Sequence, residues 1–360
     1  MGSGSFFLGD EIFVRAVANT GFYFVNWSKD SSLESEEAEF YYVMPDEDVV
    51  LVANFNEHEL FEHYELDFSH YVHDLFFVDD FIYVASESGF HIFYVDGYEL
   101  DSISSFEIGE VRSIEFLELD DSNFILAFSQ DGLFVYDVSD SFNPGEVFED
   151  YSFEETVSSE VLFQNGEYFM YVGSSSKIVS VHIENQESFE KLESYEFQHV
   201  SGMQKKEIDG VDILFVSHED SLSMFRIEEQ LYFIEQISVD SEISDFDIIE
   251  IDNTFFLFVG AEDYIRIFVI DNFEFYLIIE DFFERAILSL ETFFINNKPL
   301  GIVGLDDGFV LLDLEGGEPI IIKEYDDFLI WNSLKFVEDN YFVFSSEGLV
   351  LIEFFDEYFI

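Results

Sequence analysis

The sequence predicts an all-β fold, with a small N-terminal β domain followed by a seven-bladed β-propeller. Residues 81–95 read as a β-hairpin, with an apolar strand, a short polar turn and a second apolar strand. This pattern recurs, and the residues that open its second strand are Gly89, Gly132, Lys177, Ser221, Tyr264, Gly308 and Gly348. Their successive spacings are 43, 45, 44, 43, 44 and 40 residues, the length of a four-stranded propeller blade. The 48 Phe and 19 Tyr residues also suit pleated sheets.

The first 56 residues read as a unit of their own. Residues 9–27 alternate apolar and polar side chains around a turn at 19–21, as half-buried strands do. A polar loop is expected at 28–39, and two further strands at 40–43 and 49–55.

Several positions in this unit carry a resemblance to a known family. They are Gly9-Asp10, Ala18, Gly21, Phe24, Trp27, Met44-Pro45 and Ala53-Asn54-Phe55. In this pattern the segment resembles the divergent internalin-B-type bacterial repeat. The family has one more strand before its Gly-x-Gly segment. The resemblance therefore implies that the sequence is the C-terminal part of a longer surface protein, with its export signal upstream.

The propeller is expected over residues 57–360. In the first repeat, strands a, b, c and d are predicted at 72–78, 81–85, 90–95 and 102–108, with polar turns between them. Five of the seven b strands carry a small residue near their end: Ala85, Gly173, Ser217, Gly260 and Gly304. Small residues are expected there if the inner strands converge on an axis.

The last repeat, residues 330–360, contains strands a, b and c and then stops. A ring whose first and last blades share no strand leaves open sheet edges. The strand-like segment 58–68 precedes the first repeat, and we expect it to complete the last blade as its outer strand.

The loop at 137–144, after the c strand of the second repeat, carries a further resemblance. Its sequence Asp-Val-Ser-Asp-Ser-Phe-Asn-Pro resembles the LVIVD-type propeller repeat of bacterial and archaeal surface proteins. The paired Gly-His and Trp-Asp dipeptides of WD40 repeats are absent. The resemblance implies an extracellular or cell-surface location.

The charge balance restricts the class of partner. The chain has 79 Asp and Glu residues against 13 Lys and Arg, a net charge of −66. Nucleic acids and anionic membranes are poor partners, because phosphate contacts need clustered Lys and Arg. Cations and basic partners are favoured, and adaptation to a salt-rich habitat also explains the composition. The absence of cysteine excludes disulfides and thiolate chemistry, and no apolar run is long enough to span a bilayer.

The turns between strands b and c carry the candidate ligands of a metal ion. Their carboxylates are Glu87, Asp131, Glu219, Asp220, Glu262, Asp263, Asp306, Asp307 and Glu347. A ring of these groups would bind Ca²⁺ or a basic partner, since hard cations take oxygen ligands. The alternative is chance, because turns favour Asp and the chain is rich in acids.

Four histidines lie near the start of the repeats: His58, His63, His70 and His73. Both neighbouring pairs have odd spacing, so on a regular strand their side chains point to opposite faces. We expect scattered surface histidines there and no metal site.

No catalytic motif is found, and no catalytic or cofactor-binding residue is assigned. We expect a non-catalytic, monomeric cell-surface or secreted binding or adhesion module. Its partner would be a protein or a carbohydrate, with Ca²⁺ as the one candidate ion. The alternative is a propeller hydrolase or lyase acting on carbohydrate, since fold does not fix function.

Overall fold

The computed structural model describes residues 4–17, 22–29, 32–57, 61–66, 68, 70–96, 99–164, 166–283, 285–316, 319–325, 334–337, 341–345 and 349–354. These residues form antiparallel β-sheets, and the one helical element among them is the 3₁₀ turn Tyr151–Phe153. The all-β class predicted from the sequence is confirmed. The chain divides into two compact units, Met1–Glu62 together with Phe354–Ile360, and His63–Glu353, and each is described by itself.

The small unit contains two sheets. Its strands are β1 (Glu11–Arg15), β2 (Phe22–Lys29), β3 (Ser32–Ser35), β4 (Glu39–Val43) and β5 (Leu51–Glu57). β1 pairs with β4, and the second sheet has the order β3-β2-β5. The indole of Trp27 is buried and donates to the carbonyl of Ala38 at 3.2 Å, which ties the two sheets together.

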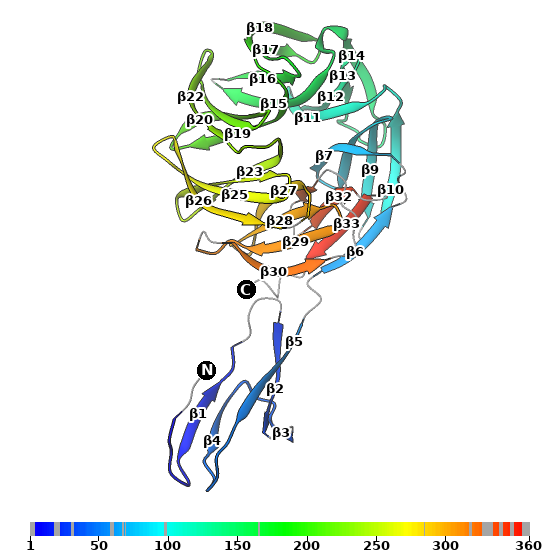
Figure 1. Ribbon diagram of the computed structural model, residues 1–360. Coiled ribbons are helices and arrows are strands. Elements are labelled where there is room, and N and C mark those ends of the chain that lie inside the picture. Colours follow the sequence, from blue (N-terminus) through cyan, green and yellow to red (C-terminus); the bar gives the residue numbers. More distant parts are fainter. Residues whose placement is uncertain are drawn as a thin grey trace. The chain divides into compact units, whose positions relative to one another are not determined.

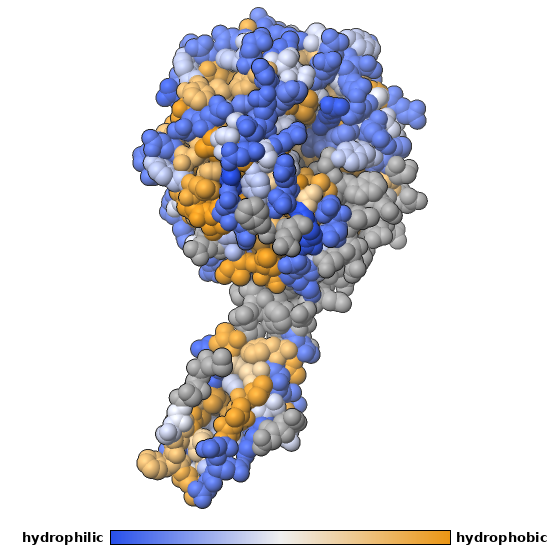
Figure 2. Space-filling model, viewed as in Figure 1, coloured by the Kyte–Doolittle hydropathy of each residue, from blue (hydrophilic) through white to orange (hydrophobic). Residues whose placement is uncertain are grey.

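The polar loop expected at 28–39 is only partly correct, because it contains the short strand β3. β3 follows β2 in the chain and pairs with it in the antiparallel direction. Its sequence, Ser-Leu-Glu-Ser, has a single apolar residue, so it lacks the alternation by which strands are recognised. Apolar side chains remain exposed on this unit, among them Phe7, Tyr41 and Val50, and orange surface gathers on it in Figure 2.

The large unit contains seven four-stranded antiparallel sheets among its described residues. In the first six, four consecutive strands occupy positions a to d. The first sheet has β7 (Val72–Val78), β8 (Phe81–Ser86), β9 (Gly89–Asp96) and β10 (Glu99–Phe106). The second has β11 (Val111–Leu119), β12 (Ser122–Ser129), β13 (Gly132–Asp137) and β14 (Gly145–Asp150). The third has β15 (Thr156–Gln164), β16 (Glu167–Ser174), β17 (Lys177–Asn185) and β18 (Ser188–Glu196).

The fourth sheet has β19 (Val200–Ile208), β20 (Val211–His218), β21 (Ser221–Ile227) and β22 (Leu231–Ser238). The fifth has β23 (Ile243–Ile251), β24 (Thr254–Ala261), β25 (Tyr264–Asp271) and β26 (Glu274–Phe282). The sixth has β27 (Ile287–Ile295), β28 (Lys298–Leu305), β29 (Gly308–Asp313) and β30 (Ile320–Tyr325).

The seventh sheet differs in connectivity. It has the order β31-β32-β33-β6, with β31 (Leu334–Val337), β32 (Tyr341–Ser345), β33 (Leu349–Phe354) and β6 (Phe61–Leu66). Its fourth strand therefore comes from the segment before the first sheet, within the range 58–68 singled out in the sequence. Strand β6 lies beside β33 in Figure 1.

Neighbouring sheets contact one another through their a strands. These contacts run in the order β7, β11, β15, β19, β23, β27 and β31, and β31 also contacts β7. In Figure 1 most of these a strands lie toward the middle of the large unit, with strands such as β18, β22 and β26 at its periphery. Buried apolar clusters fill the spaces between consecutive sheets, and Leu349 of β33 packs with Val72 and Leu75 of β7.

Side-chain hydrogen bonds also join consecutive a strands. The a strands of the first six sheets each have a register shift just after their first residue. In the first, second, third and fifth sheets, the side chain of the third residue accepts a main-chain N–H group of the next sheet. Asp74 accepts from Ile114 at 3.0 Å, and Asp245 from Leu290 at 2.9 Å.

The small residues at the ends of the b strands have a packing reason. A Cβ atom added to Gly260 would lie 2.7 Å from Cγ2 of Ile287, the first residue of the next a strand. At Gly173 it would lie 2.9 Å from Cγ1 of Val200, again on the next a strand. These glycines let consecutive sheets approach closely.

Candidate functional site

The turns between strands b and c gather with the loops that connect consecutive sheets. The amide of Glu87 donates to Tyr71 O at 3.0 Å, and that of Glu219 to His199 O at 3.2 Å. The amide of Asp306 makes the same bond to Ala286 O at 3.2 Å. Each of these turns is therefore fixed to the residue that leads into the a strand of its own sheet. We call the surface formed by these turns and loops the b–c end.

The carboxylates predicted from the sequence lie on this end and face solvent. Exposed members of the set are Glu87, Asp131, Glu219, Asp220, Glu262, Asp263, Asp306 and Asp307. Glu347 lies outside the described residues. Glu87 lies 3.9 Å from the imidazole of His70, and Asp307 pairs with Arg285 at 3.1 Å. Hydrophilic side chains likewise cover much of the visible surface of the large unit (Figure 2).

These carboxylates do not converge as a chelating set. In the described part of the chain, one group of three His or acidic side chains lies close enough together to share a metal ion. None of the predicted turn carboxylates belongs to this group. The arrangement on the b–c end is thus a distributed acidic surface, suited to a partner that carries several positive charges.

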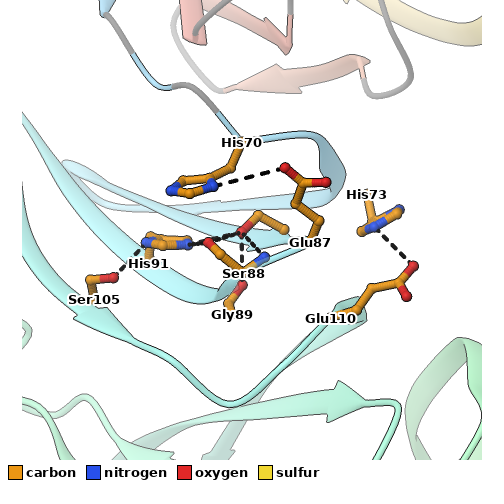
Figure 3. A network of polar contacts seen from close by, with 9 residues as sticks. His70, His73, Glu87, Ser88, Gly89, His91, Ser105 and Glu110 are labelled. Carbon is orange, nitrogen blue, oxygen red and sulfur yellow. Dashed lines mark hydrogen bonds and ion pairs between the residues drawn. The ribbon is translucent and has the colours of Figure 1, made fainter.

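Histidines form a polar network on the first sheet (Figure 3). The His91 side chain is 5% exposed, and its Nδ1 lies 2.9 Å from Ser105 Oγ. Its Nε2 lies 2.9 Å from Ser86 Oγ and 3.2 Å from Ser88 Oγ. The ring of His70 stacks on that of His91, with centroids 5.8 Å apart.

Burial decides the protonation of this network. Loss of hydration, with a smaller contribution from the nearby imidazole of His70, lowers the pKa of His91 to about 4. Burial likewise lowers the pKa of His73, although Glu110, at 3.2 Å from its Nε2, opposes the shift. His91 is thus neutral at pH 7. Its ring nitrogens form hydrogen bonds with three serines, which lie on β8, in the b–c turn and on β10.

The histidines predicted to be scattered over this region are only partly described. His58 lies outside the described residues, and the side chain of His63 is not described. His70 stacks on His91 of β9, whereas His73 contacts Glu110. The pattern of residues on strand β9 does not reveal the contacts of His91, because its neighbours come from the b–c turn and from β10.

A hollow of about 420 Å³ opens on the b–c end beside the fourth sheet. Its lining includes His218, Glu219, Ser223, Gln236 and the aromatic rings of Phe197, Phe225 and Phe233. Nε2 of His218 lies 2.8 Å from Ser223 Oγ, and burial lowers the pKa of His218. The hollow therefore combines aromatic walls with neutral hydrogen-bonding groups and an acidic rim.

The comparisons with known proteins bear first on the N-terminal unit. Residues 1–59 match the family model of the divergent InlB B-repeat domain. The resemblance drawn from the sequence of the small unit is therefore confirmed. A search of curated proteins found no match to the chain.

Solved structures resemble this chain in fold. The extracellular domain of BT4673 from B. thetaiotaomicron, described as a one-component system, is 11% identical with a TM-score of 0.58. A second structure of this domain, described as part of a hybrid two-component system, is 13% identical with the same TM-score. In both, the match covers 82% of this chain and 40% of the other. The computationally designed Ika8 protein is 14% identical, with a TM-score of 0.53 and coverage of 80% and 98%.

Identities this low concern the fold alone, and the chain spans about 40% of the length of the BT4673 domain. Among the described residues, no helical segment has the length and apolarity of a membrane span.

Proposed function

We propose that the large unit is a closed seven-bladed β-propeller that serves as a non-catalytic binding module of a cell-surface or secreted protein. Strand β6 would close the ring as the outer strand of the last blade. Support comes from the cyclic order of the a-strand contacts and from the place of β6 beside β33. The match of residues 1–59 to a bacterial repeat family supports the surface location.

The LVIVD-like character of the repeats is part of this proposal. In the second sheet, the loop that carries the resemblance is held by its own aspartates. Ser139 N donates to Asp137 Oδ1 at 2.9 Å, and Asn143 Nδ2 donates to Asp140 Oδ2 at 2.8 Å. These contacts give the Asp, Ser and Asn residues of the pattern a structural role in the turn.

We place the binding surface at the b–c end, and its partner would be a basic segment of another protein. The observation that carries this assignment is the coincidence of eight exposed turn carboxylates with the aromatic hollow beside His218. Carboxylates distributed over several turns attract a partner with spaced Lys or Arg side chains, and aromatic walls accept their alkyl stems.

A charge-matched pair of variants tests this assignment. The first carries Glu219→Gln, Asp220→Asn, Glu262→Gln and Asp263→Asn at the b–c end. The control removes the same number of charges at the opposite end of the sheets, with Asp209→Asn, Asp252→Asn, Glu229→Gln and Asp271→Asn; these control positions are also exposed. Binding of a lysine-rich peptide is followed by fluorescence anisotropy at low and physiological salt.

The first variant should bind the peptide at least about tenfold more weakly than the control, because local charge pairs act within a Debye length of about 8 Å. Equal losses in both variants would reduce the effect to overall charge and overturn the assignment. Turnover of any member of a polysaccharide panel by the full chain would overturn its non-catalytic part.

A further inference from the structure

One histidine and two glutamates meet on the outer hairpin of the third sheet. His182 and Glu184 are two residues apart on β17, on either side of Ile183, where a register shift begins. Glu190 on β18 lies directly opposite His182 in the strand register. One ligand atom from each of the three lies within 4.8 Å of the others. We propose that His182, Glu184 and Glu190 bind a divalent transition-metal ion, with Zn²⁺ as the best fit.

Residues of neighbouring strands lie close to the imidazole of His182 and to the carboxylate of Glu184. Oε2 of Glu167, at the start of β16, lies 3.8 Å from Nε2 of His182. The ring of Phe169, which lies opposite His182 on β16, has its centroid 5.2 Å from that of the imidazole. Ser188 Oγ donates to Glu184 Oε2 at 2.9 Å, which orients that carboxylate. Three carboxylates thus surround one imidazole that is only 22% exposed.

The surroundings give this group a route for ion entry. A hollow of about 660 Å³ adjoins it, lined by His182, Glu184, Glu167 and the acidic turn residues Asp120 and Asp121. Both Glu184 and Glu190 are exposed. A bound cation would relieve the repulsion among the clustered carboxylates, and the open side would leave room for water on the metal.

The donor set selects the class of ion. Ca²⁺ and Mg²⁺ take oxygen ligands, whereas an imidazole nitrogen suits Zn²⁺ and its first-row neighbours. Ligands of tetrahedral Zn²⁺ lie about 2.0–2.2 Å from the metal and therefore about 3.3 Å from one another. The observed spacing needs only rotation of the exposed glutamate side chains to reach this geometry. This site is separate from the b–c end, because it lies where β17 turns into β18.

Calorimetric titration of the full chain with Zn²⁺, after removal of metals by a chelator, tests the site. The buffer contains about 0.5 M NaCl and excess Mg²⁺, because salt screens diffuse attraction to the acidic surface. The wild type should bind one equivalent, and both His182→Ala and Glu190→Gln should weaken binding at least tenfold. Glu187→Gln, which removes one charge from the same hairpin outside the group, should bind as the wild type does.

A spectroscopic readout accompanies the titration. Co²⁺ loaded in place of Zn²⁺ should show d–d absorption that requires His182, and Zn²⁺ should shift the imidazole resonances of His182 in NMR spectra. Circular dichroism confirms that each variant is folded. If His182→Ala does not fold, Glu190→Gln alone tests the site. Absence of one-equivalent Zn²⁺ binding by the wild type, or wild-type affinity in both site variants, would overturn the proposal.

Discussion

Replacement of Asp247 by Ala should destabilise the large unit more than any other change to a single side chain of strand β23. Asp247 is 7% exposed and its carboxylate accepts four hydrogen bonds. Oδ1 accepts from Gln204 Nε2 and from Ile248 N, both at 2.7 Å. Oδ2 accepts from the amide and the hydroxyl of Thr292, both at 2.6 Å. One side chain thus joins the fourth, fifth and sixth sheets.

The expected magnitude follows from these bonds. A hydrogen bond to a charged group contributes about 1.5–3 kcal/mol, and buried donors left without an acceptor carry the desolvation cost. With water replacing some of the acceptors, Asp247→Ala should lower the free energy of unfolding by about 3–5 kcal/mol. Asp247→Asn keeps the shape but turns its amide group toward one pair of donors, so it should cost about 2–3 kcal/mol.

Urea denaturation, monitored by circular dichroism and by fluorescence, measures both variants. The matched control is Glu250→Ala, on the same strand and exposed, which should change stability by no more than about 0.5 kcal/mol. If Asp247→Ala were as stable as this control, the carboxylate would not join the sheets, and the account of their packing through the a strands would be wrong.

Three further predictions concern the stability of the chain. Burial lowers the pKa of His91 to about 4 in the folded chain, below its ordinary 6.5. Between pH 4 and 6.5, His91 is therefore protonated in the unfolded chain but neutral in the folded chain. Stability from His91 is therefore complete above pH 6.5 and is lost as pH falls toward 4; by pH 4.5 the wild type should lose about 2–3 kcal/mol more than His91→Gln, and parallel pH curves for the two would contradict this. Gly260→Ala places a Cβ atom 2.7 Å from Ile287 and should cost about 1–3 kcal/mol in denaturation experiments, whereas Gly145→Ala, with open space around it, should be nearly neutral. Because the net charge is −66, NaCl should raise the thermal midpoint by screening repulsion, and a midpoint independent of salt would argue against it.

Much of the fold follows from local patterns that the sequence displays. In the first repeat, strands a to d were expected at 72–78, 81–85, 90–95 and 102–108, and they lie at Val72–Val78, Phe81–Ser86, Gly89–Asp96 and Glu99–Phe106. Alternating apolar residues and polar turns locate such strands without tertiary information. The missing fourth strand of the last repeat likewise pointed to the segment that contains β6.

The side-chain clusters could not be found in the same way, because they depend on register between strands. His182 and Glu184 show the even spacing of a shared face, but Glu190 joins them only through the register of the β17–β18 hairpin. That register includes a shift between Ile183 and Asn185, which no local pattern predicts. The network of His91 depends in the same way on residues from a turn and a neighbouring strand.

The position of strand β6 tests the proposed closed ring most directly. The chain has no cysteine, so pairs of cysteines introduced at 62 or 64 on β6 and at 351 or 353 on β33 can be oxidised without side reactions. A pair at 134 and 149, which are register partners on β13 and β14, serves as the positive control. If the ring is closed, at least one β6–β33 pair should form an intramolecular disulfide in the folded full chain. Failure of every such pair, with the control pair oxidised, would contradict it.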